Sequence, residues 1–268
     1  MKSAAFDYAR PRDVAEALKL LSSEEAKVAA GTQSLGPMLN LRVVQPRLLV
    51  DVRFIEELQY VKETAESVSL GACVTHAQIE DGRVPDPTGG FMRSVAASIA
   101  YRAVRNRGTL GGSLAHADPA ADWPSALLAL GAFAVIEGPR GRREVSMDQF
   151  LTGVFETALG KGELLVAVRI PKRSRRARYG YWKFCRRAGE FAQAIGAVLR
   201  DPERNEARAV IGAIAGSPFL LPDSKTFLGK ISNEAALAAA DAAGLSRDPY
   251  NRQLHAVALR RAAAQLFQ

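Results

Sequence analysis

The chain has 268 residues, of which 36 are Lys or Arg and 28 are Asp or Glu, giving a formal net charge of +8. With 48% hydrophobic and 24% charged residues, it has the composition of a folded globular protein, and its length predicts one large or two modest domains. The longest apolar stretch, 126–136, is too short to span a membrane. Only Cys73 and Cys185 are present, far apart, so thiolates of this chain alone cannot build a zinc site or an iron–sulfur cluster.

The first 171 residues mix short apolar strands with helices that are amphipathic or rich in alanine. Helices are predicted over 11–21, 92–104 and 122–130. The strands expected around them cover 27–30, 48–52, 68–74, 132–137, 143–145 and 164–170. This pattern predicts helices packed on one or more sheets.

A boundary is predicted just after Pro171, which ends an apolar strand. Strands are expected beyond it over 181–186, 191–199 and 207–214, followed by helices over 233–243 and 249–267. Strands followed by helices favour a separate α+β unit over a doubly wound parallel sheet. The basic segment 172–178, with aromatic residues after it, is typical of a solvated connector, and nucleic-acid binding is the alternative.

The segment 30–35, Ala-Gly-Thr-Gln-Ser-Leu, follows a predicted strand directly. Gly31 lets the backbone approach a ligand closely, and successive N–H groups in such a turn can bind an anion such as phosphate. The Walker motif is excluded because Pro37-Met38 stands where Lys and Ser or Thr are required, and Ser34 lacks the glycine frame of a hydrolase elbow. A plain tight turn is the alternative.

The second glycine segment covers 107–124 and begins with Arg107-Gly108; its part 109–122 reads Thr-Leu-Gly-Gly-Ser-Leu-Ala-His-Ala-Asp-Pro-Ala-Ala-Asp. Its small residues leave room for a ligand near the backbone, and its hydroxyl and carboxylate groups can bond sugar hydroxyls. It does not match the glycine fingerprint of Rossmann folds. The spacing of His116, Asp118 and Asp122 fits no specific metal site, so no metal is expected, and Asp122 could also serve only to cap a helix.

Together, the two segments resemble the two FAD-binding loops in the medium subunits of molybdenum hydroxylases, the carbon monoxide dehydrogenase and xanthine dehydrogenase flavoprotein family. The resemblance covers the whole chain and includes Tyr-Asn-Arg-Gln-Leu-His at 250–255. It implies an α+β protein with a two-subdomain FAD-binding fold of the vanillyl-alcohol-oxidase (PCMH) type over 1–172, whose subdomains cover about 1–55 and 56–172. A smaller α+β C-terminal domain with antiparallel strands and helices would cover 173–268.

The resemblance also implies which residues contact the cofactor. Backbone N–H groups of the first loop would wrap the pyrophosphate of a noncovalently bound FAD, the second loop would approach it from the opposite side, and Asp122 would bond the ribityl chain. The cofactor-binding residues implied are Ala30, Gly31, Thr32, Gln33, Ser34, Leu35, Thr109, Gly111, Gly112, Ser113, Asp122, Leu165 and Lys183. No catalytic side chain is implied. Many relatives have Gly-His where Thr32-Gln33 stand here, and some place Tyr near the flavin ring at the position of Phe191.

The function that the resemblance implies is electron transfer. A large subunit would oxidise the substrate at a molybdenum cofactor, [2Fe-2S] clusters of a small subunit would pass the electrons to FAD in this chain, and the flavin would reduce an external acceptor. The resemblance implies a dimer of heterotrimers. A cytoplasmic location is expected, since the first residues contain no apolar core of a signal peptide. The alternatives are a noncatalytic assembly subunit without flavin and a stand-alone FAD oxidase.

Overall fold

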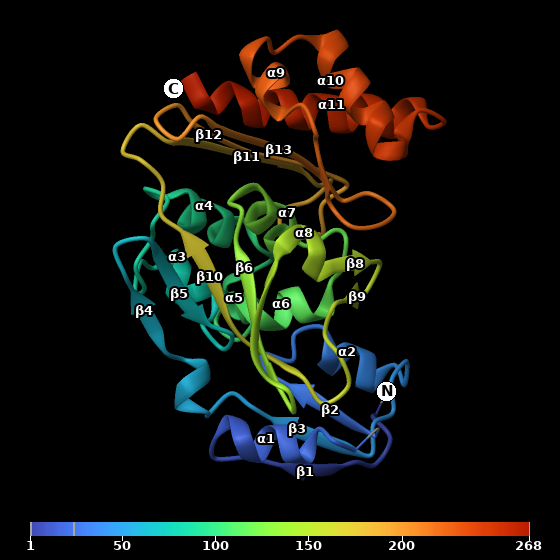
Figure 1. Ribbon diagram of the computed structural model, residues 1–268. Coiled ribbons are helices and arrows are strands. Elements are labelled where there is room, and N and C mark those ends of the chain that lie inside the picture. The colour runs from blue at the N-terminus through green and yellow to red at the C-terminus, as the bar shows by residue number, and fades with distance from the viewer. Residues whose placement is uncertain (1, 24, 268) are drawn as a thin grey trace.

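The computed structural model describes residues 2–23 and 25–267, and its sheets follow one another from the N-terminal to the C-terminal end of the molecule (Figure 1). The first sheet is parallel, in the order β1-β3-β2. Its strands are β1 (Asp7–Ala9), β2 (Ala26–Ala29) and β3 (Leu48–Asp51). Helix α1 (Val14–Leu20) packs Val14 and Ala17 into the core beside this sheet, and the Asp13 side chain caps the helix. Helix α2 (Leu35–Asn40) follows β2.

The second sheet is antiparallel, in the order β4-β5-β10-β6-β7. Its strands are β4 (Val61–Glu63), β5 (Ser67–Gly71), β6 (Phe133–Gly138), β7 (Gly141–Ser146) and β10 (Leu164–Pro171). The helices of this part of the chain are η1 (Glu56–Leu58), α3 (His76–Glu80), α4 (Phe91–Ser98), α5 (Arg102–Arg105), α6 (Leu110–His116), α7 (Asp122–Ala129) and α8 (Met147–Phe150). A small hairpin, β8 (Leu151–Gly153) with β9 (Glu156–Thr157), leads back to β10.

The third sheet is antiparallel and lies between two layers of helices (Figure 1). Its strands are β11 (Arg178–Phe184), β12 (Ala194–Asp201), β13 (Glu206–Gly212) and β14 (Phe219–Leu220). One face packs on α4 and α7, and the other carries α9 (Ser224–Gly229), α10 (Asn233–Ala240) and α11 (Pro249–Ala264). Gly180 and Gly196 let α11 pack closely, since built β-carbons would lie 2.0 Å and 2.6 Å from backbone oxygens of that helix.

The mixed helix-and-sheet fold confirms the predicted α+β class, but several predicted bounds were wrong. The helix predicted over 92–104 is two helices, α4 and α5. It breaks because Ala100 has a positive φ of 40° and the Arg105 guanidinium donates hydrogen bonds to the carbonyl oxygens of Ile99 and Ala100. The strand predicted over 68–74 ends at Gly71, where the chain turns towards α3.

The C-terminal elements also differ from the prediction in detail. The strand predicted from 191 begins at Ala194, and the helix predicted over 233–243 ends as α10 at Ala240. A wide turn, η2 (Asp241–Leu245), follows because Gly244 has a φ of 85°. The last predicted helix is α11, which continues into a short 3-10 turn, η3 (Gln265–Phe267). None of the helices in the described part of the chain could cross a membrane, since none is both long and apolar enough.

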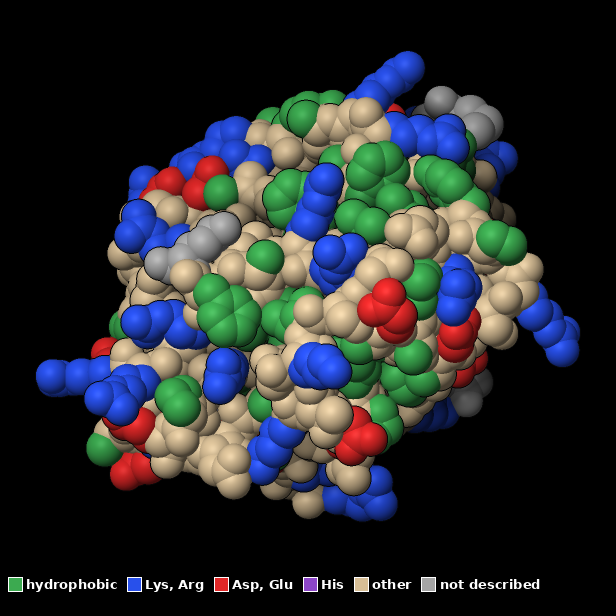
Figure 2. All heavy atoms as spheres, turned by 90° about the horizontal axis from the view of Figure 1, so that it is seen from above, with side chains coloured by type: hydrophobic (Ala, Val, Ile, Leu, Met, Phe, Trp, Pro, Cys, Tyr) green, Lys and Arg blue, Asp and Glu red, His purple; other side chains and the backbone are tan. Residues whose placement is uncertain are grey.

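Ion pairs hold several of the cations in the basic connector 172–178. Lys172 pairs with Glu63 at 2.6 Å, and Arg173 pairs with Glu206 at 2.9 Å. On the face seen from above, over the C-terminal helices, Lys and Arg side chains are dispersed among neutral and hydrophobic ones (Figure 2). On this face the cations do not form a continuous basic stripe of the kind that a nucleic-acid groove requires.

Candidate functional site

The two glycine segments, about 80 residues apart in the sequence, lie directly against each other. A β-carbon built on Gly31 would lie 2.2 Å from the carbonyl oxygen of Arg107 and 2.7 Å from the Cα atom of Gly108. One built on Gly112 would lie 3.8 Å from the β-carbon of Ala30. Only glycine at position 31 permits this approach, so the backbones of the two segments form one continuous surface.

The first segment is a turn with unused hydrogen-bond donors. Thr32 has a φ of 58°, the Gln33 side-chain amide donates to the carbonyl oxygen of Gly31, and the N–H of Gly36 returns to Thr32. Within 2–23 and 25–267, no residue accepts a hydrogen bond from the backbone N–H groups of Thr32, Gln33, Ser34 or Leu35. Since these residues are half-buried, the turn presents a row of unpaired donors suited to an anion.

The second segment differs, because its backbone donors are already paired. The N–H groups of Leu110 and Gly111 donate to carbonyl oxygens of Val74 and Ala72, and that of Gly112 donates to the Thr109 hydroxyl. Thr109 thereby caps α6. A β-carbon on Gly111 would lie 2.8 Å from the Ala72 Cα atom, which explains glycine there. This segment can therefore contribute the shape of its backbone and side-chain hydroxyls, such as that of the half-buried Ser113, to a ligand site. It contributes no free N–H group from Leu110, Gly111 or Gly112.

Asp122 and Lys183, both predicted as site residues, form a nearly buried ion pair. Lys183 Nζ lies 2.8 Å from Asp122 Oδ1, and their side chains are 10% and 9% exposed. Lys183 also donates to the carbonyl oxygen of Ser98 at 2.7 Å. The pair joins α7 to β11, so it fixes the C-terminal sheet against the helices beneath it. Asp122 is the first residue of α7 but makes no side-chain cap there.

Leu165, another residue implied as a cofactor contact, lies on β10. Its side chain is buried in the main hydrophobic core, so it can offer a ligand only its backbone. The neighbouring Val166 carbonyl accepts a hydrogen bond from Ala72 N, and the Ala72 carbonyl accepts one from Gly111 N, both at 2.9 Å. The backbone at this bulge of β10 is thus tied to the second glycine segment.

Sequence reasoning did not single out His76, which links the backbone at Gly108 to Trp123, the residue next to Asp122. Its Nδ1 accepts a hydrogen bond from Trp123 Nε1 at 3.0 Å, and its backbone N–H donates to Gly108. The ring packs against Gly108, where a β-carbon would lie 2.8 Å from His76 Nε2. Burial lowers the pKa of His76 to about 4, with a smaller effect from the Arg105 charge, so the ring is neutral and carries its proton on Nε2.

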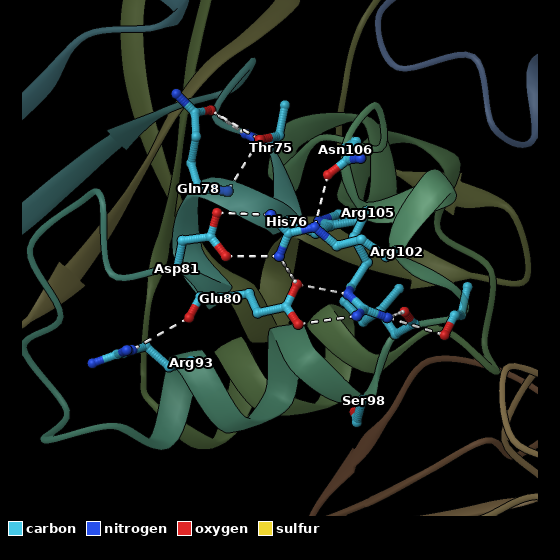
Figure 3. A network of polar contacts seen from close by, with 12 residues as sticks. Thr75, His76, Gln78, Glu80, Asp81, Arg93, Ser98, Arg102, Arg105 and Asn106 are labelled. Atoms are coloured by element: carbon cyan, nitrogen blue, oxygen red, sulfur yellow. Dashed lines mark hydrogen bonds and ion pairs between the residues drawn. The ribbon is translucent and has the colours of Figure 1, made fainter.

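A polar network holds the helices that precede the second segment (Figure 3). Glu80 accepts hydrogen bonds from both Arg102 and Arg105, and Asp81 accepts two from Arg102. The hydrogen bond from Arg105 is the main reason why the pKa of Glu80 is lowered. The network anchors α5 to α3, so it fixes the position at which the chain enters the second segment.

Two further polar residues at Asp122 were missed by sequence reasoning. The Tyr181 hydroxyl lies 2.6 Å from Asp122 Oδ1, and the Ser98 hydroxyl lies 3.1 Å from the same oxygen. Strand alternation places Tyr181 on the same face as Lys183, which was the available signal.

Among the residues described, no group of three or more His, Cys, Asp or Glu side chains is arranged to hold a metal ion. Cys73 is buried, which raises the pKa of its thiol to about 12.

Comparison with known proteins identifies the family. Residues 4–173 match the family described as "FAD binding domain in molybdopterin dehydrogenase". The chain is 36% identical to the nicotine 6-hydroxylase medium subunit of Paenarthrobacter nicotinovorans, over 92% of this chain and 88% of that protein. It is 35% identical to the carbon monoxide dehydrogenase medium chain of Hydrogenophaga pseudoflava, over 89% of this chain and 85% of that one.

Solved structures agree with this assignment. A carbon monoxide dehydrogenase chain from Hydrogenophaga pseudoflava superposes with a TM-score of 0.91 and 32% identity, covering 100% of this chain and 99% of that chain. A chain of quinoline 2-oxidoreductase from Pseudomonas putida 86 gives a TM-score of 0.86 and 33% identity, with 99% and 98% covered. The family resemblance seen in the two glycine segments is therefore confirmed, and the chain belongs to the FAD-binding domain family of molybdopterin dehydrogenases.

Proposed function

We propose that this chain is the FAD-binding medium subunit of a molybdenum hydroxylase, which accepts electrons from [2Fe-2S] clusters of a small partner subunit and passes them to an external acceptor. The observation that carries the proposal is the contact of the two glycine segments at Gly31, beside a turn with unpaired backbone N–H groups. A diphosphate needs several such donors on a surface that no side chain obstructs. The first segment supplies the donors, and its glycine leaves the backbone there without a side chain.

The assignment of residues to the cofactor follows from this fit. The turn N–H groups would bind the pyrophosphate, while the backbone of Gly111 and Gly112 and the hydroxyls of Thr109 and Ser113 would line the opposite wall. Asp122, held by Lys183, would accept a hydrogen bond from a ribityl hydroxyl. The proposed contacts are Ala30, Gly31, Thr32, Gln33, Ser34, Leu35, Thr109, Gly111, Gly112, Ser113, Asp122, the backbone of Leu165, and Lys183.

Bound FAD supplies the redox chemistry, which protein side chains cannot provide, and the chain supplies position and electrostatics. No acid–base role is assigned to any side chain. The neutral His76 ring and the buried Asp122–Lys183 pair act as fixed supports. We assign 1–172 to an FAD-binding domain, with subdomains over about 1–55 and 56–172, and 173–268 to a C-terminal flavoprotein domain.

The partners proposed are a large subunit with the molybdenum cofactor and a small iron–sulfur subunit, assembled as a dimer of heterotrimers in the cytoplasm. Several relatives are named as medium subunits or chains of dehydrogenases or hydroxylases, which supports such an assembly. With only two cysteines, this chain has too few thiolates for two [2Fe-2S] clusters of its own. The clusters therefore belong to another subunit in this proposal.

The test is the visible spectrum of the chain purified under mild conditions with its native partners. Flavin absorption, with FAD released intact on denaturation, is the expected result and would establish noncovalent binding. A complex that assembles fully but contains no flavin would support the assembly-subunit alternative instead. Substrate-dependent flavin reduction by the isolated chain would support the stand-alone oxidase.

A further inference from the structure

The hydrogen bonds at Asp122 are all made to one of its two oxygens. Oδ1 lies 2.6 Å from the Tyr181 hydroxyl, 2.8 Å from Lys183 Nζ and 3.1 Å from the Ser98 hydroxyl. Ser98 has a single hydroxyl proton and lies closer to the Val95 carbonyl oxygen, at 2.7 Å. Tyr181 and Lys183 are therefore the two principal donors. No residue in the described part of the chain donates to Oδ2, although Asp122 is only 8% exposed.

Tyr181 is itself held from both sides. Its backbone N–H donates to Gln265 Oε1 at 2.9 Å, and the Gln265 amide donates back to the Tyr181 carbonyl at 3.0 Å. Its ring meets Phe91 edge to face, with centroids 6.3 Å apart and planes at 86°. Burial raises the pKa of the Tyr181 hydroxyl well above its usual value, and the neighbouring Asp122 charge adds to this. The hydroxyl is thus a permanent proton donor to Oδ1.

We propose that Tyr181 is a positioning residue for the cofactor: by fixing Oδ1 of Asp122, it leaves Oδ2 as the acceptor that meets a ribityl hydroxyl. This inference rests on the proposed function. Without the tyrosine hydroxyl, the Asp122 carboxylate can rotate about χ2. Lys183 then pairs with either oxygen, so neither oxygen stays free to accept a hydrogen bond from a ligand. Flavin affinity therefore depends on a residue of the C-terminal sheet that need not touch the flavin.

Tyr179 provides a matched control within the same strand. It lies two residues before Tyr181 on the same face of β11 and also packs on Phe91, with ring centroids 5.5 Å apart. Its hydroxyl makes no hydrogen bond to any residue of 2–23 or 25–267. Tyr179→Phe and Tyr181→Phe each remove one oxygen from a tyrosine that packs on Phe91, but only the second removes a donor to Asp122.

The experiment measures the FAD dissociation constant of the full-length chain, freed of flavin, by fluorescence titration. We expect Tyr181→Phe to raise this constant roughly tenfold, the scale of a lost hydrogen bond to a charged group, and Tyr179→Phe to change it less than about twofold. Asp122→Ala, which removes both oxygens, is combined with Tyr181→Phe as a cycle. If Tyr181 acts through Asp122, the double variant binds FAD no more weakly than Asp122→Ala alone.

A second readout separates positioning from folding. A purely structural role would lower the melting temperature of the FAD-free chain and leave the rise on adding FAD unchanged, whereas the proposal predicts a smaller rise for Tyr181→Phe. Equal affinities for the two Phe variants, or independent effects of Tyr181→Phe and Asp122→Ala, would overturn the inference while leaving the proposed function intact. Failure of the unmodified chain to bind FAD would overturn both.

Discussion

Gly31 lies so close to Arg107 that a β-carbon on Gly31 would be 2.2 Å from the Arg107 carbonyl oxygen. The obstacle is backbone, which cannot move aside as a flexible side chain can. We expect Gly31→Ala to separate the two glycine segments, to lower the free energy of unfolding by about 1–3 kcal/mol, as overpacking does, and to abolish flavin retention. Urea unfolding and the flavin-to-protein ratio after purification measure the two effects.

Gly36 is the matched control in the same loop. A β-carbon there would have no atom of the described residues within 4 Å, and the residue lies in α2. Gly36→Ala should leave flavin content unchanged and should stabilise the chain by up to about 1 kcal/mol, since alanine favours a helix. Equal flavin content in the two variants would show that the close contact is not needed for binding.

Burial of the neutral His76 ring makes stability depend on pH. His76 has a pKa of about 4 in the folded chain against 6.5 as a model value, so the unfolded chain takes up its proton first as the pH falls. The stabilisation is therefore complete above pH 6.5 and is lost as the pH falls towards 4. The difference between these two pKa values corresponds to about 3 kcal/mol of unfolding free energy.

Urea unfolding of wild type and His76→Gln between pH 7.5 and 4 measures this contribution. Glutamine can still accept the Trp123 hydrogen bond but does not titrate, so the variant should show a flatter profile. His116→Gln is the control: His116 is only half-buried, and burial lowers its pKa less far, so most of the pH dependence should remain. Identical profiles for wild type and His76→Gln would contradict the prediction.

Lys183 should matter far more than a comparable surface lysine. Its removal in Lys183→Met leaves the nearly buried Asp122 carboxylate without its counter-ion, which should cost about 3–5 kcal/mol of unfolding free energy and weaken FAD binding. Lys172→Met breaks the pair with Glu63, whose side chain is 50% exposed, and should cost less than about 1 kcal/mol. Denaturant unfolding of both variants tests this, and equal losses would refute it.

The contact between the glycine segments could be anticipated only through the family resemblance. Local pattern correctly placed Gly31 after a strand, but the helix α6, which begins after Thr109, was not predicted, and nothing local to either segment specifies that they meet. The same holds for Asp122 and Lys183: each was implied as a cofactor contact, whereas their ion pair depends on how the C-terminal sheet packs on α4 and α7.

Where the sequence prediction was wrong, a long-range contact outweighed a local preference. The alanine-rich run 92–104 has the composition of one helix, yet the Arg105 side chain pairs with Glu80 and bonds the carbonyls at Ile99 and Ala100, which stabilises a break there. Tyr181 was read as part of an ordinary strand because alternation tells which face a side chain occupies. Alternation does not indicate that the Asp122 carboxylate lies next to the Tyr181 hydroxyl.

Tyr101 holds the loop that joins β11 to β12 through contacts with Ala188 and Gly189. The Tyr101 hydroxyl donates to the Ala188 carbonyl oxygen at 3.0 Å, and a β-carbon on Gly189, which has a φ of 88°, would lie 2.5 Å from the tyrosine ring. The loop carries Arg186 and Arg187, both exposed and open to trypsin once the loop detaches. Tyr101→Ala should therefore speed tryptic cleavage at these arginines severalfold, because local opening of the loop becomes easier.

Global stability should change little in this variant, since Tyr101 is 62% exposed and lies outside the hydrophobic core. Mass spectrometry of the fragments during limited digestion identifies the cut, and urea unfolding checks that the whole chain has not loosened. Tyr60→Ala removes a tyrosine that is 53% exposed elsewhere and should leave the cleavage rate unchanged. Tyr101→Phe keeps the ring on Gly189 and loses only the hydrogen bond, so it should cleave at an intermediate rate. A rate for Tyr101→Ala equal to that of wild type would mean that the loop is held by other contacts.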